Sequence, residues 1–330
     1  MEAKVKISVI IPVYNLDRYV SACLDSVLAA ARSANVDLEV ICVDDGSTDG
    51  SGAILDGYAS GDRRIHVVHR PNSGAGSARN AGMDVATGDW LTFVDGDDIW
   101  LANYLSTAEA LIRRHPSSDI VSLACEPFED RADAPEPSGS AAREAVFDVC
   151  ACVPHALLRD VGVFPTLFRR DFVGAERFAG LVLGEDRLFV VSCLVRASSV
   201  VRSETVVHGY RLRADSAMRS SWRPEKTMSL VDYSFGSIQR LATCGKWVET
   251  GAFTSFLSGV LLAEAPKNCS LFSPAYRAVW SRWRKAVAEV DTRLMPSRHS
   301  FARRLILYAS HFRVLSLLVA RILRRLGVTR

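Results

Sequence analysis

The sequence lacks long hydrophobic runs, and this bears on membrane insertion. No uninterrupted apolar stretch reaches the roughly 18 to 20 residues that a helix needs to span a bilayer. The chain passes from Lys6 directly into a short apolar run, without the basic, apolar and small-residue series of a signal peptide. We therefore expect no transmembrane helix and a cytoplasmic location.

The sequence also has little net charge and no cysteine spacing typical of a metal site. Its formal net charge of +3 gives no argument for nucleic acid, and we expect no nucleic-acid partner. None of the eight cysteines forms a Cys-x-x-Cys pair, which argues against zinc. Several lie in apolar runs, where a free cysteine behaves as a small hydrophobe.

A third absence concerns glycine after the first apolar run, Lys6–Pro12. The run is followed by Val13-Tyr14-Asn15, whereas a dinucleotide dehydrogenase carries Gly-x-Gly-x-x-Gly at this place. We use this absence to reject a dehydrogenase. A nucleotidyltransferase on a related fold would place a Gly-rich segment with Arg and Lys here, and it remains the less supported alternative.

Short apolar runs alternate with helical patterns through about the first 100 residues. The apolar runs are 6–12, 38–43, 64–69 and 90–94, and the helical patterns are 18–32, 50–60 and 75–86. This alternation is typical of βαβ units and a parallel sheet. Near-continuous apolar strands indicate that helices cover both faces. The predicted fold class is α/β, with a mostly parallel central sheet flanked by helices.

Each predicted strand ends in polar residues. These are Tyr14-Asn15, Asp44-Asp45, Asn72-Ser73 and the segment 95–98, which holds three aspartates. In open α/β sheets, ligands bind outside the carboxyl ends of the strands, so we expect one site at this edge.

The three aspartates form the most concentrated charge in this set. Side chains at i and i+2 of an extended chain point to the same side, so Asp95 and Asp97 converge, and Gly96 allows a tight turn between them. Such a group suits a hard divalent ion such as Mg²⁺ or Mn²⁺. The alternative for an Asp-x-Asp alone is a solvated acidic turn.

Five segments resemble one enzyme family in order and spacing. They are 10–15, 43–49, 77–82, 86–90 and 93–98, and a thinner resemblance continues through 184–189 and 210–216. Together they resemble the family 2 glycosyltransferases, inverting enzymes with the A-type fold, including those of bacterial capsule and exopolysaccharide synthesis. The resemblance implies transfer of a sugar from a nucleotide-diphospho-sugar, which we expect to be a UDP-sugar, to a saccharide or lipid-linked saccharide.

The resemblance also implies roles for single residues. Asp97 is expected to bind a divalent metal, and Asp95 to lie nearer the ribose as a second ligand, with Asp98 secondary. The residues expected to hold the nucleobase and ribose are Pro12, Val13, Tyr14 and Asp45. For Asp44 the alternative is structural, namely accepting backbone donors in the turn after the second strand.

Two sets of arginines are candidates for the diphosphate. Arg79 lies in a Gly-rich turn that opens into a helix, and it either reaches a phosphate or pairs with Asp84 or solvent. Arg211 and Arg213 belong to the segment 210–216 and are expected to bind the diphosphate bidentately. Their alternative is a basic strand edge that faces water.

Glu185-Asp186 precedes an apolar helical pattern. The resemblance implies that Asp186 is the general base for the acceptor hydroxyl, while an acidic residue at a helix start is also favourable for structural reasons alone. A non-catalytic, membrane-associated module of the same fold is the second alternative. The carboxylates at Asp95, Asp97 and Asp186 argue against it.

The remaining elements are less regular. We predict helices at 102–115, 188–195 and through most of 226–290, strands at 119–125 and 200–210, a loop at 126–144, and a helix then a strand within 147–170. The predicted domains are a catalytic domain at 1–220, with a nucleotide part at 1–100 and an acceptor part at 101–220, and a helical extension at 221–297. A basic amphipathic helix is predicted at 298–330.

The C-terminal helix is predicted from an asymmetry of charge. No Asp or Glu follows Asp291, while arginines recur to Arg330 and apolar residues step by three and four. Such a helix lies in the membrane interface or docks on the protein's own core. The first interpretation predicts peripheral contact with the inner face of the plasma membrane.

Overall fold

The computed structural model describes residues 3–130, 134–135, 143–149, 162–182 and 184–213, with single residues at 157, 229, 232, 233, 236, 274 and 281. The chain divides into two compact units. The first comprises residues 1–150, 161–180 and 197–219, and the second comprises residues 151–160, 181–196 and 220–330. Neither unit follows the domain boundaries given above, which stay a prediction.

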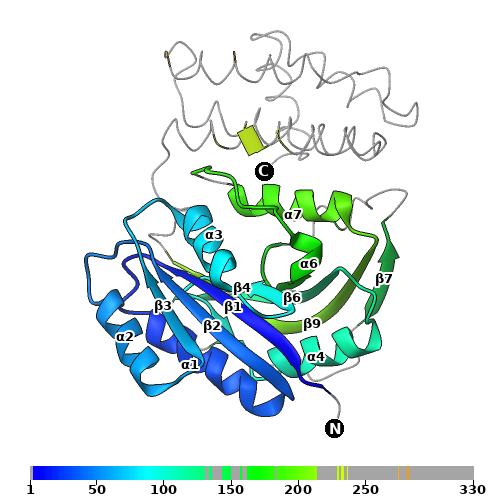
Figure 1. Cartoon of the computed structure of the whole chain (residues 1–330), viewed down its shortest axis with the longest axis horizontal. Helices are drawn as coiled ribbons and strands as arrows, with labels where there is room; N and C mark the ends of the chain where they lie inside the picture. The colour runs from blue at the N-terminus through cyan, green and yellow to red at the C-terminus, as the bar shows by residue number, and fades with distance from the viewer. Residues whose placement is uncertain are drawn as a thin grey trace. The chain divides into compact units, whose positions relative to one another are not determined.

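The first unit begins with four parallel strands. They are β1 (Val5–Val13), β2 (Val36–Asp44), β3 (Ile65–His69) and β4 (Trp90–Phe93), in the order β3-β2-β1-β4 (Figure 1). The predicted strands and their parallel pairing are confirmed. Val13 pairs with Asp44, and Asp44 with His69, so the three carboxyl ends lie at one edge.

Helices cover both faces of this part of the sheet, as predicted. They are α1 (Val20–Ala30), followed by the short turn η1 (Ala31–Ser33), then α2 (Ser51–Gly61), α3 (Ala75–Val85) and α4 (Tyr104–Arg114). Helix α1 contacts α2 and α4, while α3 packs against β1 and β2 from the opposite side (Figure 1). Ile7, Val9 and Ile11 pack in the core with α1, whereas Ile10 approaches Gly82 of α3. Burial on both faces explains the near-continuous apolar strands.

The second part of the sheet is mixed. Its strands are β5 (Ile99–Trp100), β6 (Ile120–Glu129), β7 (Glu144–Asp148), β8 (Thr166–Arg169) and β9 (Ser199–Leu212), and α6 (Arg170–Val173) follows β8. Beyond β4 the order is β8-β6-β9-β5, with β7 on β9. Strand β8 is antiparallel to β4 and β6, and β9 is parallel to β6 but antiparallel to β5 and β7.

One sequence prediction in this region was wrong. The loop predicted from Glu126 begins too early, because β6 continues to Glu129 through Pro127. Strand β6 pairs with β8 only up to Ser122 within the described residues, so at Pro127 it is paired with β9 alone, and proline is tolerated on a strand with one free edge. Phe147 belongs to β7, and the helix predicted after it falls mainly outside the described residues.

The described part of the second unit centres on α7 (Glu185–Arg196), which confirms the predicted helix. Gly184 before it has φ +86°, and a Cβ there would lie 3.1 Å from the Tyr233 side chain. The predicted helices at 226–290 and 298–330 fall outside the described residues, apart from isolated positions. Within the described residues, no helix is long and apolar enough to cross a membrane.

Candidate active site

The loops after β1 and β2 are bonded to each other. Thr48 N–H donates to Asn15 Oδ1 at 2.8 Å, and Asn15 N–H donates to Ser47 Oγ at 3.1 Å. Asn15 has φ 53°, a left-handed conformation that Asn tolerates. Pro12 and Val13 are buried at the end of β1, while Tyr14 is 48% exposed at the carboxyl edge of the sheet.

Asp44 has the structural role considered for it above. Its carboxylate accepts Ser47 N–H at 2.9 Å and bonds His69 Nδ1 at 2.9 Å. Burial raises the pKa of Asp44, but the hydrogen bonds from Ser47 and His69 outweigh it and lower the pKa below its usual value. Asp44 therefore fixes the turn after β2.

Asp45 organises the Gly-rich turn that opens α3. It is 2% exposed, and its carboxylate accepts Ser73 N–H at 3.0 Å and Gly74 N–H at 2.7 Å. Arg70 Nε lies 3.3 Å from the same carboxylate. These contacts join the ends of β2 and β3, and the predicted contact of Asp45 with a nucleotide stays a prediction.

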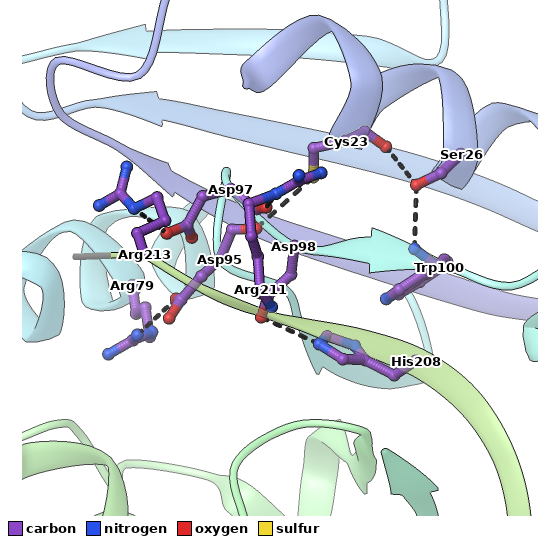
Figure 2. Close-up of polar contacts among 10 residues, drawn as sticks. All are labelled: Cys23, Ser26, Arg79, Asp95, Asp97, Asp98, Trp100, His208, Arg211 and Arg213. Atoms are coloured by element: carbon purple, nitrogen blue, oxygen red, sulfur yellow. Dashed lines mark hydrogen bonds and ion pairs between the residues drawn. The ribbon is translucent and has the colours of Figure 1, made fainter. Parts of the chain in front are cut away.

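The segment 95–98, here named the carboxylate turn, follows β4. A Cβ at Gly96 would lie 2.9 Å from Leu16 Cδ1, so the turn fits closely against the loop after β1. Helix α1 also contacts the turn, because Cys23 Sγ approaches the Asp95 carbonyl oxygen at 3.6 Å. Figure 2 shows Asp95, Asp97 and Asp98 gathered in this turn, as their spacing predicts.

Asp95 is paired with Arg79. Arg79 Nη2 donates to Asp95 Oδ1 at 2.7 Å, and the arginine is 3% exposed on α3. Its guanidinium also lies 5.4 Å from the centroid of the Phe178 ring. The alternative pair with Asp84 is not observed, since Asp84 pairs with Arg177 at 2.8 Å instead, and the phosphate contact of Arg79 stays a prediction. In this structure Arg79 positions Asp95.

Asp98 is held by β9. Its carboxylate, 1% exposed, bonds His208 Nε2 at 2.9 Å and accepts Arg211 N–H at 2.9 Å (Figure 2). Burial raises the pKa of Asp98, and its bond to His208 opposes this. Sequence reasoning missed His208, because nothing in the pattern of strand 200–210 indicates that its side chain meets residue 98.

Asp97 is the carboxylate of the turn whose negative charge is least compensated by its surroundings. Arg213 Nε lies 2.9 Å from its Oδ2, and Arg211 Nε donates to its carbonyl oxygen at 2.7 Å. Burial, followed by the charges of Asp95 and Asp98, raises the pKa of Asp97 to about 7 despite Arg213. A cation at this carboxylate would relieve the repulsion.

Residues 8–138 match the model of the family described as glycosyl transferase family 2, a segment that includes the carboxylate turn. The chain carries a family 2 glycosyltransferase domain. Among its curated relatives is the glycosyltransferase EpsJ of Bacillus subtilis, 44% identical over 102 residues, which make up 31% of this chain and 27% of EpsJ. The matches span less than two fifths of the length of such relatives.

Solved structures show the fold over almost the whole chain. S. aureus TarS in complex with UDP-GlcNAc aligns with a TM-score of 0.75 at 20% identity, covering 98% of this chain and 92% of that one. The mannosyltransferase PcManGT from Pyrobaculum calidifontis, in complex with GDP-Man and Mn²⁺, aligns with a TM-score of 0.55 at 16% identity, covering 98% and 88%. The α/β fold with a central sheet flanked by helices is therefore confirmed.

The family 2 domain offers a limited set of metal ligands. Within the described residues, no group of three or more His, Cys, Asp or Glu side chains could hold a metal ion alone. Asp97, with its unbalanced charge, and Asp95 beside it fit a hard cation that takes one or two carboxylates from protein and further oxygens from phosphates or water.

Aromatic rings support the two arginines, a feature that sequence reasoning missed. The Tyr19 ring centroid lies 5.5 Å from the Arg211 guanidinium and 4.9 Å from that of Arg213. Phe128 lies 4.6 Å from Arg211, and Tyr19 OH donates to Asp130 at 3.1 Å. The arginines therefore contact the carboxylate turn and these rings, and do not form a solvated strand edge.

Asp186 belongs to the second unit. It is the second residue of α7, with Glu185 before it. Acidic side chains in the first turn stabilise a helix through their interaction with the helix dipole. Its assignment as general base stays a prediction.

Proposed function

We propose that this chain transfers a sugar from a nucleotide-diphospho-sugar, with a UDP-sugar as the first candidate, to an acceptor hydroxyl, inverting the anomeric centre. The observation that carries the proposal is the carboxylate turn, which gathers the partly buried Asp97 with Asp95 and Asp98 at the sheet edge where ligands bind. Support for the donor class comes from TarS, solved with UDP-GlcNAc, and from PcManGT, solved with GDP-Man and Mn²⁺.

The nucleotide would bind at the ends of β1 and β2. Tyr14 presents an exposed aromatic ring there, beside the buried Pro12 and Val13. Aromatic side chains stack on planar rings and bury large area at low entropy cost. Asp45 holds the neighbouring turn in place, which fixes the wall on which the ribose would rest.

The diphosphate would bind beside Asp97 and Asp95. A divalent cation held by these carboxylates would neutralise charge on the leaving diphosphate. Arg211 and Arg213, which already contact the turn, would add guanidinium donors suited to phosphate oxygens. Asp186 would accept the proton of the acceptor hydroxyl, and a single in-line displacement needs no further nucleophile.

The acceptor would be a saccharide or lipid-linked saccharide of a cell-surface polysaccharide. This part rests on the predicted helix at 298–330, which would hold the protein at the inner face of the plasma membrane while the site faces the cytoplasm. The helix lies outside the described residues, so the support is the pattern of its sequence.

The test compares the wild type with Asp97→Ala and Asp186→Asn. Purified protein is assayed for UDP release from UDP-sugars, with Mn²⁺, Mg²⁺ or excess chelator, and for transfer to candidate acceptors. We expect cation-dependent turnover in the wild type, weaker donor binding in Asp97→Ala, and a lower kcat with little change in KM in Asp186→Asn. Activity that survives chelator would reject the cation, and near-normal turnover of Asp186→Asn would reject the base.

A further inference from the structure

The three carboxylates of the turn have different kinds of partner. Asp95 is bonded by Arg79, whose side chain is 4% exposed on α3, and Asp98 is bonded by His208, which is fully buried in β9. Both partners belong to regular elements of the core. Neither can leave without exposing or orphaning a buried charge, so these two pairs are fixed parts of the fold.

The partner of Asp97 is placed differently. Arg213 follows Leu212, the last residue of β9, so its backbone lies beyond the sheet. The two side chains of this pair are 13% and 16% exposed, more than those of Arg79 or His208. Figure 2 shows Arg213 reaching Asp97 from the end of the strand. Of the three partners, Arg213 is the one that can move with the least disturbance of the core.

Arg213 also stands where a cation would bind. Its Nε lies 2.9 Å from Asp97 Oδ2, an ion pair that uses one oxygen of the expected ligand. A divalent ion on the same carboxylate would repel the guanidinium, because like charges a few ångströms apart raise each other's energy. Cation and guanidinium therefore compete for one group.

Arg211 does not compete in this way. It donates to the carbonyl oxygen of Asp97 through Nε and to that of Asp130 through Nη1, and its own N–H bonds Asp98. Its contacts go to backbone oxygens and a structural carboxylate, so they remain when a cation binds. The two arginines of the segment thus have separate tasks.

We propose that Arg213 stands in for the cation on Asp97 when no donor is bound, and that cation binding displaces it toward the donor diphosphate. The second half of this exchange rests on the proposed function. The displacement is short, because Tyr19 lies under the guanidinium at 4.9 Å and keeps it at the site edge. The exchange leaves neither Asp97 nor Arg213 without a partner of opposite charge.

The exchange predicts opposite effects of one substitution on two ligands. In Arg213→Ala, Mn²⁺ alone should bind more tightly than in the wild type, by about fivefold to tenfold, since a nearby positive charge has been removed. UDP in saturating Mn²⁺ should bind about tenfold more weakly, since a charge-assisted phosphate contact is lost. A general loss of structure would weaken both.

The measurements are Mn²⁺ titrations followed by electron paramagnetic resonance and UDP titrations followed by calorimetry, on the full chain. Arg177→Ala is the matched control, because it removes an arginine that pairs with Asp84 elsewhere in the same unit. It should change neither affinity. Both titrations are repeated on Arg213→Gln, which has a neutral side chain of similar length. This variant tests the competition if the alanine variant does not fold.

Unchanged or weaker Mn²⁺ binding in the folded Arg213 variants would overturn the competition. Tighter Mn²⁺ binding with unchanged UDP affinity would overturn the transfer of Arg213 to the diphosphate. If the wild type binds Mn²⁺ but neither UDP nor other nucleotide diphosphates, the proposed function fails, while the Mn²⁺ titrations still decide the competition.

Discussion

The pair formed by His208 and Asp98 contributes to the stability of the fold more than to the reaction. Both are buried to 1% exposure or less, and the Asp98 carboxylate also accepts the Arg211 N–H. A carboxylate in such a place depends on its donors, since an unpaired buried charge is costly. The pair links the carboxylate turn to β9. It therefore fixes the backbone from which the side chains of Arg211 and Arg213 extend.

We expect His208→Ala to destabilise the protein by about 3 kcal/mol, because the substitution removes one partner of a buried pair and leaves Asp98 with one donor fewer. Urea unfolding measures the loss. The control is His66→Ala, an exposed residue of β3, which should change the free energy of unfolding by less than about 0.5 kcal/mol. Equal effects of the two substitutions would contradict the assigned role of the pair.

Gly96 is the second residue on which the turn depends. A Cβ there would lie 2.9 Å from Leu16 Cδ1 and 3.3 Å from Val13 Cγ2. We expect Gly96→Ala to cost about 1–3 kcal/mol of stability by overpacking. It should also weaken Mn²⁺ binding, because the turn must shift.

The matched control for this substitution is Gly57→Ala within α2. Among the described residues, no atom lies within 4 Å of a Cβ placed at Gly57. Alanine in a helix interior should stabilise by about 0.5–1 kcal/mol. Thermal unfolding and Mn²⁺ titration of both variants check the pair, and a Gly96 variant that behaves like the Gly57 variant would refute the packing argument.

At the scale of elements, His69 connects three of them. It stands at the end of β3 and bonds Asp44 of β2 at 2.9 Å and Asp56 of α2 at 3.0 Å. Hydrogen bonds to Asp44 and, to a smaller extent, to Asp56 raise the pKa of His69. Hydrogen bonds from Ser47 and His69 lower the pKa of Asp44. The contact therefore stabilises the fold within a pH range that the pKa of Asp44 limits on the acid side and the pKa of His69 limits on the basic side.

The sign of the pH dependence follows from these directions. A raised His69 pKa stabilises the fold below about pH 6.5, and this is lost as pH rises through the folded pKa. A lowered Asp44 pKa stabilises above about pH 4, and this is lost as pH falls through the folded pKa. We expect His69→Gln to lose more stability at pH 5.5 than at pH 8.5 in urea unfolding. The same loss at both values, or His66→Gln showing the same trend, would contradict the linkage.

Most elements of the first 100 residues were predictable, because apolar runs of strand length alternate with helical patterns. Pro127 shows where such patterns fail. Proline forbids a strand only where its N–H would be paired, and the sequence does not tell which strands lie at an edge. The antiparallel insertion of β8 between β4 and β6 is likewise a tertiary arrangement that local patterns do not encode.

The gathering of the aspartates was predictable, but the partners of the residues at the candidate site were not. The carboxylate turn follows from local spacing alone, as does the role of Asp44. The partners of Arg79 and Asp98 lie 16 and 110 residues away in the sequence, and they meet only through the packing of α3 and β9. Asp84, the local alternative considered for Arg79, is bonded instead by Arg177, which lies 93 residues away in the sequence.

At the scale of the whole molecule, the C-terminal segment decides where the enzyme would act. Residues 298–330 carry many arginines and no Asp or Glu, and their apolar positions recur at helical spacing. Anionic lipid attracts such a segment by about 1 kcal/mol per basic residue near the surface, and burial of the apolar face adds to this. A helix docked on the protein would use the same apolar face for the core.

Truncation after Ser297 separates the two interpretations. We expect the full chain to float with vesicles that contain anionic lipid and to be released by high salt, because salt screens the attraction. The truncated chain should remain folded, keep its Mn²⁺ affinity and stay at the bottom of the gradient. A variant with Arg321, Arg324 and Arg325 changed to Gln should float less while keeping its thermal stability. Unchanged flotation of the truncated chain would reject the membrane helix, and loss of folding would favour the docked helix, since only a core contact makes residues 298–330 necessary for stability.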